Sequence, residues 1–185
     1  MKGAWLLPTL LMVLVAGPLS SQRPTFFRES IDFDLDADWF TVNGLYFFAN
    51  PTGERLRSAI YFPVAVKTDA LRYVKVSNVT KAEQLDVKCL EKGFVFNLWL
   101  MPGDTVVVNI AYAQPTRRTN EYVLASTQTW GQALKKAAYS LRVNRVLRVD
   151  SLSLPPDSIG GQTYFWSRED FFPAENFCVW VDTID

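Results

Sequence analysis

The stretch FVFNLWLMPGDTVVVNIAYA, residues 94–113, decides the fold class of this chain. It holds two runs, 94–101 and 105–113, that are rich in β-branched and aromatic residues, which favour strands. Both runs are apolar at alternate and at intervening positions, so each strand is expected inside a covered sheet, or with one face forming a binding patch. Between them, Met101-Pro102-Gly103-Asp104 has the residue order of a type II turn. Because that turn twists the wrong way for a tight hairpin, we expect an arch that joins two sheets.

Outward from this stretch, most of the sequence also predicts strands. Strand-like runs lie at residues 31–39, 40–50, 58–66, 71–78, 84–91, 121–128, 139–149, 163–167 and 176–182. Pro63 interrupts one run, which is typical of an edge strand or a bulge. Helix formers gather only at residues 130–139, so we expect at most one short helix. The sequence therefore predicts an all-β fold of about ten strands, an antiparallel β-sandwich of immunoglobulin-like or related type.

The first 21 residues have the layout of a secretory signal peptide. Lys2 precedes an apolar run from Ala4 to Ala16, and small or turn-forming residues follow it. The run is short for a membrane span and contains Pro8, although a retained N-terminal anchor is the alternative. We expect residues 1–21 to be removed and residues 22–185 to form one β-sandwich domain that is periplasmic or secreted. No later stretch of the sequence is long and apolar enough to span a membrane.

The composition argues against several classes of function. With 19 basic and 19 acidic residues, the chain has a formal net charge of zero and no basic stripe, so nucleic acid is not an expected partner. The chain has no histidine, so it lacks the Ser-His-Asp and Cys-His catalytic arrangements and the commonest metal ligand. A carboxylate pair of the glycosidase type stays open, but no spacing singles one out. We expect no enzymatic activity and no cofactor.

The stretch IDFDLDADW, residues 31–39, has an aspartate at every second position. Asp32, Asp34 and Asp36 match the first ligand positions of an EF-hand-type calcium loop, but its glycine and final glutamate are replaced by Ala37 and Asn43. Period-two spacing instead places the carboxylates on one strand face and the apolar residues on the other. We expect a half-buried strand with a solvated acidic face, including the case of a charged edge strand, and keep a cation site as the alternative.

Two cysteines, Cys89 and Cys178, remain for an oxidising compartment. An even pair favours a disulfide there. Free cysteine also packs as a small apolar residue, so two separate thiols are the alternative.

Aromatic residues are abundant and are the other candidates for ligand binding. Exposed rings can bind sugars or peptides, whereas most aromatic rings in such folds pack in the core. We single out Trp99, Trp130 and Trp166 as candidate ligand-binding residues, with core packing as the alternative.

Two segments, FTVNGLYFFANPTGERLRSAIYFPVAV and EYVLASTQTWGQALKKAAYSLRV, carry a resemblance. The first has a strand ending in Phe-x-Asn, a loop, and a strand ending in Phe-Pro. In the second, a Tyr- and Thr-rich strand precedes a Trp turn and a basic helix. Together they resemble secreted bacterial β-sandwich families of unknown function. The resemblance implies an extracytoplasmic sandwich without catalytic residues, and no functional position carries over.

The sequence thus predicts a non-catalytic protein, secreted or periplasmic, that binds another protein or a cell-envelope component. A carbohydrate-binding module that uses exposed aromatic residues is the alternative.

Overall fold

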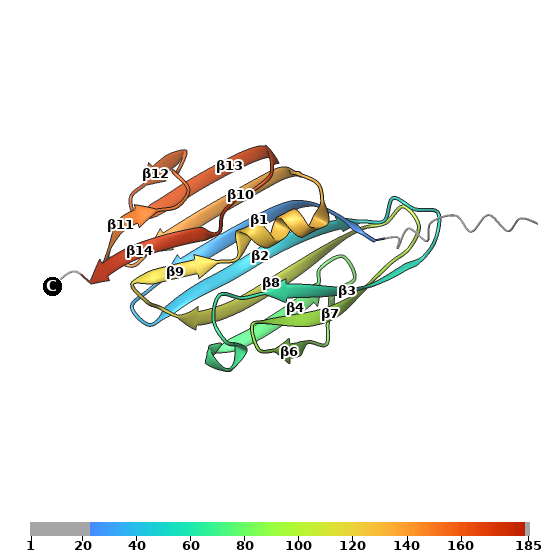
Figure 1. Ribbon diagram of the computed structural model, residues 1–185, viewed down its shortest axis with the longest axis horizontal. Coiled ribbons are helices and arrows are strands. Elements are labelled where there is room, and N and C mark those ends of the chain that lie inside the picture. Colours follow the sequence, from blue (N-terminus) through green and yellow to red (C-terminus); the bar gives the residue numbers. More distant parts are fainter. Residues whose placement is uncertain (1–22, 184–185) are drawn as a thin grey trace, which may run out of the picture.

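The computed structural model describes residues 23–183, so the expected signal peptide lies outside the described residues. These residues form one eight-stranded sheet and two three-stranded sheets, with two short 3-10 helices, η1 (Thr68–Ala70) and η2 (Leu124–Trp130) (Figure 1). The prediction of an all-β fold is confirmed.

The eight-stranded sheet is the base of the fold. Its strands, in spatial order, are β12 (Ser158–Gly160), β13 (Thr163–Phe171), β10 (Leu134–Val143), β1 (Thr25–Leu35), β2 (Trp39–Ala49), β8 (Thr105–Pro115), β4 (Tyr73–Asn78) and β5 (Glu83–Gln84). Neighbouring strands are antiparallel except β1 and β10, which are parallel. The expected purely antiparallel arrangement is therefore wrong at this one pair. Parallel pairing needs a long crossover, and the chain between β1 and β10 supplies it.

Two smaller sheets lie over one face of this base. One contains β11 (Leu147–Leu152), β14 (Phe177–Thr183) and β9 (Thr119–Tyr122), and the other contains β3 (Leu56–Pro63), β7 (Gly93–Leu100) and β6 (Lys88–Leu90). Figure 1 is viewed from the side of these two sheets. Within residues 23–183, no strand of one small sheet pairs with a strand of the other.

The core lies between the large sheet and the two small ones. Phe33 of β1 stacks on Phe177 of β14 with 4.8 Å between ring centroids, and Phe62 of β3 meets Tyr112 of β8 at 6.1 Å. Each small sheet is therefore joined to the base through aromatic contacts, which are favourable beyond the apolar area they bury.

The arch between residues 94–101 and 105–113 is confirmed. Strand β7 belongs to a small sheet and β8 to the large one, and the connecting turn has Gly103 at φ 74°. One face of β7 is buried, and the other face carries the exposed Trp99. The expectation that both faces of this strand are covered is therefore wrong. The prediction that Pro63 marks an edge strand is also confirmed, because β3 pairs only with β7 among the described strands.

The prediction of a helix at residues 130–139 is wrong. Helix η2 ends at Trp130, and β10 begins at Leu134. Strand β10 pairs with β1 on one side and β13 on the other, and it buries Leu134, Ala137 and Tyr139. This tertiary pairing overrides the local helix propensity of an Ala- and Lys-rich segment.

Three expected strands have different boundaries. The run 121–128 forms β9 and then turns into η2, and the run 84–91 is divided between β5 and β6 of two sheets. The run 139–149 is broken by a turn in which the Leu147 amide donates to the Asn144 carbonyl at 3.0 Å. Continuous β propensity cannot reveal where a chain changes sheets.

Gly93 allows the close approach of β7 to the end of β3. Its φ is 154°, and a Cβ atom there would lie 2.6 Å from the Phe62 carbonyl oxygen. We expect Gly93→Ala to lower the free energy of unfolding by about 1–3 kcal/mol, measured by chemical denaturation, because the backbone must shift. The matched control is Gly53→Ala, since a Cβ at Gly53 meets nothing within 4 Å. Equal stability of the two variants would contradict this account of the β3–β7 contact.

Candidate binding groove

A groove lies between η2 and β3, where the two small sheets leave the base uncovered. Its deeper part, the inner cavity, has a volume of about 350 Å³. The shallower part, the outer hollow, has a volume of about 480 Å³ and extends to Arg23 and Pro24. Four residues line both parts and join them into one inter-sheet groove: Ile60, Tyr61, Thr129 and Trp130.

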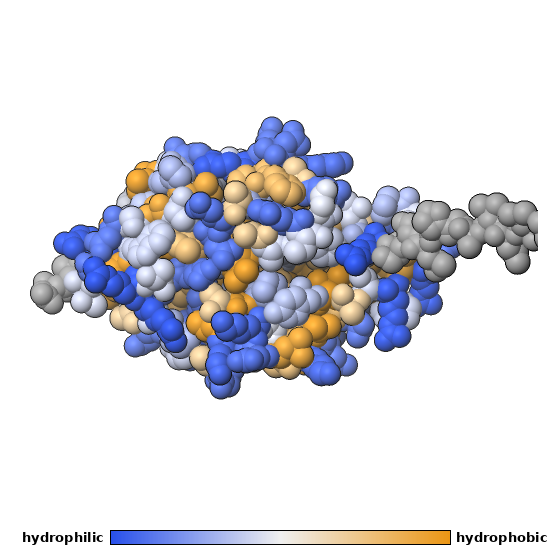
Figure 2. Space-filling view, viewed as in Figure 1, coloured by the Kyte–Doolittle hydropathy of each residue, from blue (hydrophilic) through white to orange (hydrophobic). Residues whose placement is uncertain are grey.

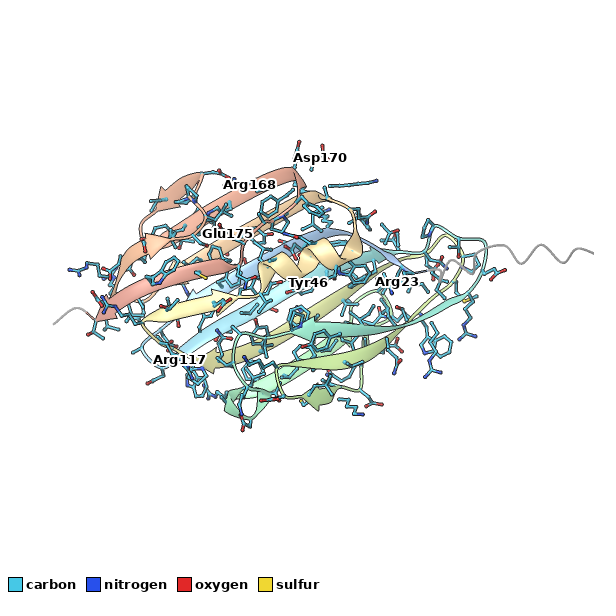
Figure 3. All side chains as sticks on the ribbon, in the orientation of Figure 1. Arg23, Tyr46, Arg117, Arg168, Asp170 and Glu175 are labelled. Atoms are coloured by element: carbon cyan, nitrogen blue, oxygen red, sulfur yellow. The ribbon has the colours of Figure 1, made fainter. Side chains whose placement is uncertain are left out.

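The figures show where the inter-sheet groove lies. In Figure 2, apolar residues reach the surface in the region between η2 and β3. Tyr46 lies in the gap between these two elements in Figure 3, and Arg23 lies further along the same gap. The groove is therefore open on the face that carries the small sheets.

One wall of the groove is the free edge of β3. All ladder pairs of β3 are with β7, and among the described residues no other backbone group is hydrogen-bonded to Leu56–Pro63. Residues 58–61 of this strand line the outer hollow. A row of backbone donors and acceptors is thus left without protein partners along the groove.

Aromatic rings make the other wall and part of the floor. Phe26 and Phe48 lie 5.3 Å apart between centroids, and each lies 5.6 Å from the Trp130 ring. Trp130 is half-buried at the end of η2, where Gly131 ends the helix at φ 69°. The three rings hold η2 against the base and leave an apolar surface on the groove side.

Glu29 is the only carboxylate among the residues that line the inner cavity. A bulge between Phe26 and Arg28 shifts the register of β1, so that both Phe26 and Glu29 face inward. The Glu29 side chain is 1% exposed, and the Tyr139 hydroxyl donates to its Oε1 at 2.5 Å. Within residues 23–183, no basic side chain forms an ion pair with it. Burial raises the pKa of Glu29 to about 7, although the Tyr139 hydrogen bond opposes the rise.

Three further tyrosines are buried in the same core. Tyr46 and Tyr122 join their hydroxyl oxygens at 3.0 Å, and both residues line the inner cavity. The Tyr112 hydroxyl is buried and has no hydrogen-bond partner among the described residues. Burial raises the pKa of all three phenols, so they remain protonated donors.

Gly44 makes room for the Tyr46 ring. A Cβ atom on Gly44 would lie 2.6 Å from the ring and from the hydroxyl oxygen of Tyr46. Gly44 and Tyr46 face the same side of β2, so the ring leans along the strand over the glycine. A glycine two positions before a buried tyrosine therefore helps to shape the floor of the cavity.

The structure does not bring together the three tryptophans that the sequence singled out. Trp130 lines the groove, whereas Trp166 is buried and its Nε1 donates to the Leu154 carbonyl at 3.0 Å. The Trp166 ring packs in the core, so it leaves no exposed face for a ligand. Trp99 is 40% exposed on the outer face of β7, with the guanidinium groups of Arg55 and Arg57 at 4.5 and 5.0 Å from its ring centroid.

The four aspartates of residues 31–39 form two pairs: Asp32 and Asp34 lie on β1, and Asp36 and Asp38 lie in the turn that follows it. Asp32 accepts a hydrogen bond from Ser140, and Asp34 is paired with Arg142, on the outer face of β1. Asp36 Oδ1 instead accepts the backbone amides of Asp38 and Trp39 in the turn before β2. The expected acidic strand face is confirmed for the first pair only. The expectation that this strand is a charged edge strand is wrong, because β1 lies between β10 and β2. Among residues 23–183, no three His, Cys, Asp or Glu residues are placed to hold a metal ion.

The two cysteines are separate thiols, the second of the two alternatives. Cys89 is exposed on β6, and Cys178 is half-buried on β14. Burial raises the pKa of the Cys178 thiol. The strands β6 and β14 belong to different small sheets. The two thiol groups therefore form no disulfide with each other in this structure.

Sequence reasoning missed Glu29, Tyr46, Tyr122 and Tyr139. For Glu29 a signal was present, since it has the same strand parity as the buried Ile31, Phe33 and Leu35. An acid in phase with core residues predicts a buried carboxyl group. The tyrosines carry no comparable signal. Tyr46 and Tyr139 come near Glu29 only through the pairing of β1 with β2 and β10, and Tyr122 only through the packing of β9 over the large sheet.

The comparisons with known proteins bear on the fold. The sequence matches no protein-family model and no curated protein. Its fold is similar to that of a "putative nutrient binding protein" from Legionella pneumophila, with a TM-score of 0.74, 14% identity, and coverage of 89% of this chain and 68% of that chain.

Two further solved structures are similar over part of their length. One is a mutant form of the M1 zinc metallopeptidase from Deinococcus radiodurans, with a TM-score of 0.51, 11% identity, and coverage of 85% of this chain and 42% of that chain. The other is a "putative protease" from Parabacteroides distasonis, with a TM-score of 0.50, 10% identity, and coverage of 87% and 40%. The chain thus spans about two fifths of the length of these two proteins. At such identities the similarity shows the fold alone.

Glu29 makes the stability of the protein depend on pH. In the folded state its pKa is about 7, above the ordinary value of 4.5, so the folded protein keeps a proton that the unfolded chain loses. The stabilisation of the folded state by this retained proton is fully present below pH 4.5 and is lost as the pH rises through 7. Relative to Glu29→Gln, we expect the free energy of unfolding of the wild type to fall by about 3 kcal/mol over this range. Denaturant titrations of both proteins at several pH values measure the difference, and a pH-independent difference would contradict the burial of an unpaired acid.

Proposed function

We propose that the protein acts by binding rather than by catalysis, outside the cytoplasm, and that the inter-sheet groove holds an extended segment of another polypeptide. One observation carries the proposal: the free backbone edge of β3 runs along a groove that ends in an apolar cavity. The scaffold that we propose for this role is the expected β-sandwich, of immunoglobulin-like or related type.

The free edge of β3 favours a peptide over a compact ligand. An extended peptide can pair with an exposed strand edge through its backbone, while alternate side chains enter pockets. The ladder between β3 and β7 would then continue by one strand into the space beside η2. Such pairing would satisfy the backbone groups that β3 leaves without partners.

The inner cavity supplies the side-chain part of the recognition. Its lining is mostly aromatic and aliphatic, with Glu29 and a few hydroxyl groups as polar members. A volume of about 350 Å³ is at the lower end of the range for small-molecule sites, and it suits one or two buried side chains. Burial of such anchors gives most of the affinity in peptide complexes.

The alternative of a carbohydrate-binding module has less support. Of the three candidate tryptophans, only Trp130 lies in the groove, and its ring is packed against Phe26 and Phe48. The exposed Trp99 ring already has two guanidinium groups near it. The similarity in fold to the "putative nutrient binding protein" agrees with either version of a binding role.

A peptide selection tests the proposal. Peptides of random sequence, displayed on phage, are selected on the protein, and the affinity of enriched peptides is then measured for Ala125→Phe. Ala125 lines the inner cavity, so a phenyl ring there fills it. We expect at least a tenfold loss of affinity, about 1.4 kcal/mol. Hydrogen exchange should also slow in Leu56–Pro63 when peptide is bound.

The matched control is Ala174→Phe, at an exposed position outside the groove. This variant should bind the peptides as the wild type does. Peptides that bind Ala125→Phe with unchanged affinity, protection outside β3, or a selection that enriches no peptide would each contradict the proposed site.

A further inference from the structure

The inner cavity is lined by an ionisable residue, Glu29, that forms no ion pair within the described part of the fold. Glu29 is nine-tenths or more buried, lines the cavity, and has no basic partner among the described residues. The groups that face it are phenols: Tyr139 from β10, Tyr46 from β2 and Tyr122 from β9. A buried carboxylate normally has a cation or several donors beside it. Here one donor, Tyr139, is in place.

We infer that the inner cavity selects a side chain with an apolar stem and a terminal amine, as in lysine, whose ammonium group pairs with the Glu29 carboxylate. This inference rests on the proposed function, because it names the anchor of the polypeptide that the groove holds.

The walls of the cavity suit the stem of such a side chain. Phe26, Phe48, Ile60 and Phe62 line it with apolar surface, against which a chain of methylene groups packs. The aromatic rings also favour a cation over a neutral head group, since the ring faces attract positive charge. The apolar lining and the single acid therefore match the two ends of one long basic side chain.

The hydrogen bonds already present favour an amine over a guanidinium group. Tyr139 occupies Glu29 Oε1, so only Oε2 is without a hydrogen bond among the described residues. A guanidinium group binds best to both oxygens of a carboxylate at once, whereas an ammonium group acts as a point charge on one oxygen. Tyr46 and Tyr122 also line the cavity, and their hydroxyl oxygens can accept the remaining ammonium protons.

The proposed pairing makes binding depend on pH. An alkylamine stays protonated below pH 10, so the group that titrates is Glu29, which must lose its proton to form the pair. Below about pH 7, binding therefore releases a proton, and affinity falls by up to tenfold for each pH unit. Above this range the carboxylate is already ionised and affinity is level.

The test uses two small probes that differ only in the head group. The compound n-butylamine reproduces the lysine side chain, and 1-butanol has the same stem without the charge. Binding of each to the protein is followed by NMR at pH 8 and pH 6. We expect the amine to bind at least tenfold more tightly than the alcohol at pH 8 and to lose most of that advantage at pH 6. In Glu29→Gln the two probes should bind alike.

Equal affinities in the wild type, an advantage of the amine that survives in Glu29→Gln, or no binding of either probe would overturn the inference. If Glu29→Gln does not fold, Tyr139→Phe gives the same test. Loss of the Tyr139 hydroxyl raises the Glu29 pKa further, so the pH at which amine binding weakens should move upward. An unchanged pH dependence in this variant would also overturn it.

The outcomes separate this inference from the proposed function. Peptides that bind the groove without a basic anchor, together with equal affinities for the two probes, would remove the inference and leave the proposed function. Selective binding of n-butylamine without any peptide binding would remove the proposed function instead.

Discussion

The two small sheets cover the same face of the large sheet without pairing with each other, and the site depends on this constraint. Each small sheet buries its own part of the base, but the gap between them cannot be closed by strand pairing. Helix η2 and the rings around Trp130 close one side of the gap and leave β3 as an open edge on the other. The groove is thus a consequence of how the layers are divided, and the residues that line it come from both layers.

The bulge in β1 places an acid inside this gap. Desolvation makes a charged Glu29 unfavourable, so near neutral pH the free protein holds it partly protonated, with one hydrogen bond from Tyr139. A cation that enters the cavity would remove part of this penalty. Stability and binding are therefore coupled through the same group: ionisation that weakens the empty fold prepares the site for a basic ligand.

Local sequence patterns predicted the all-β class, the arch at Met101–Asp104 and the edge position of β3. These features depend on local chemistry, namely alternation, a turn sequence and the missing amide of Pro63. The parallel pairing of β1 with β10 and the helix at η2 could not be predicted, because each depends on contacts between segments far apart in the sequence. The same limit applied to the site, since Glu29 lay in a readable pattern but its tyrosine neighbours did not.

The titration of the Glu29 carboxyl group by carbon-13 NMR tests the central claim most directly. The Glu29→Gln variant assigns the resonance, and the titration is repeated with n-butylamine present. The account predicts an apparent pKa near 7 in the free protein and a lower value with the amine bound, because the ammonium group favours the ionised carboxylate. A pKa near the ordinary 4.5 in the free protein, or a value that the amine leaves unchanged, would contradict the account.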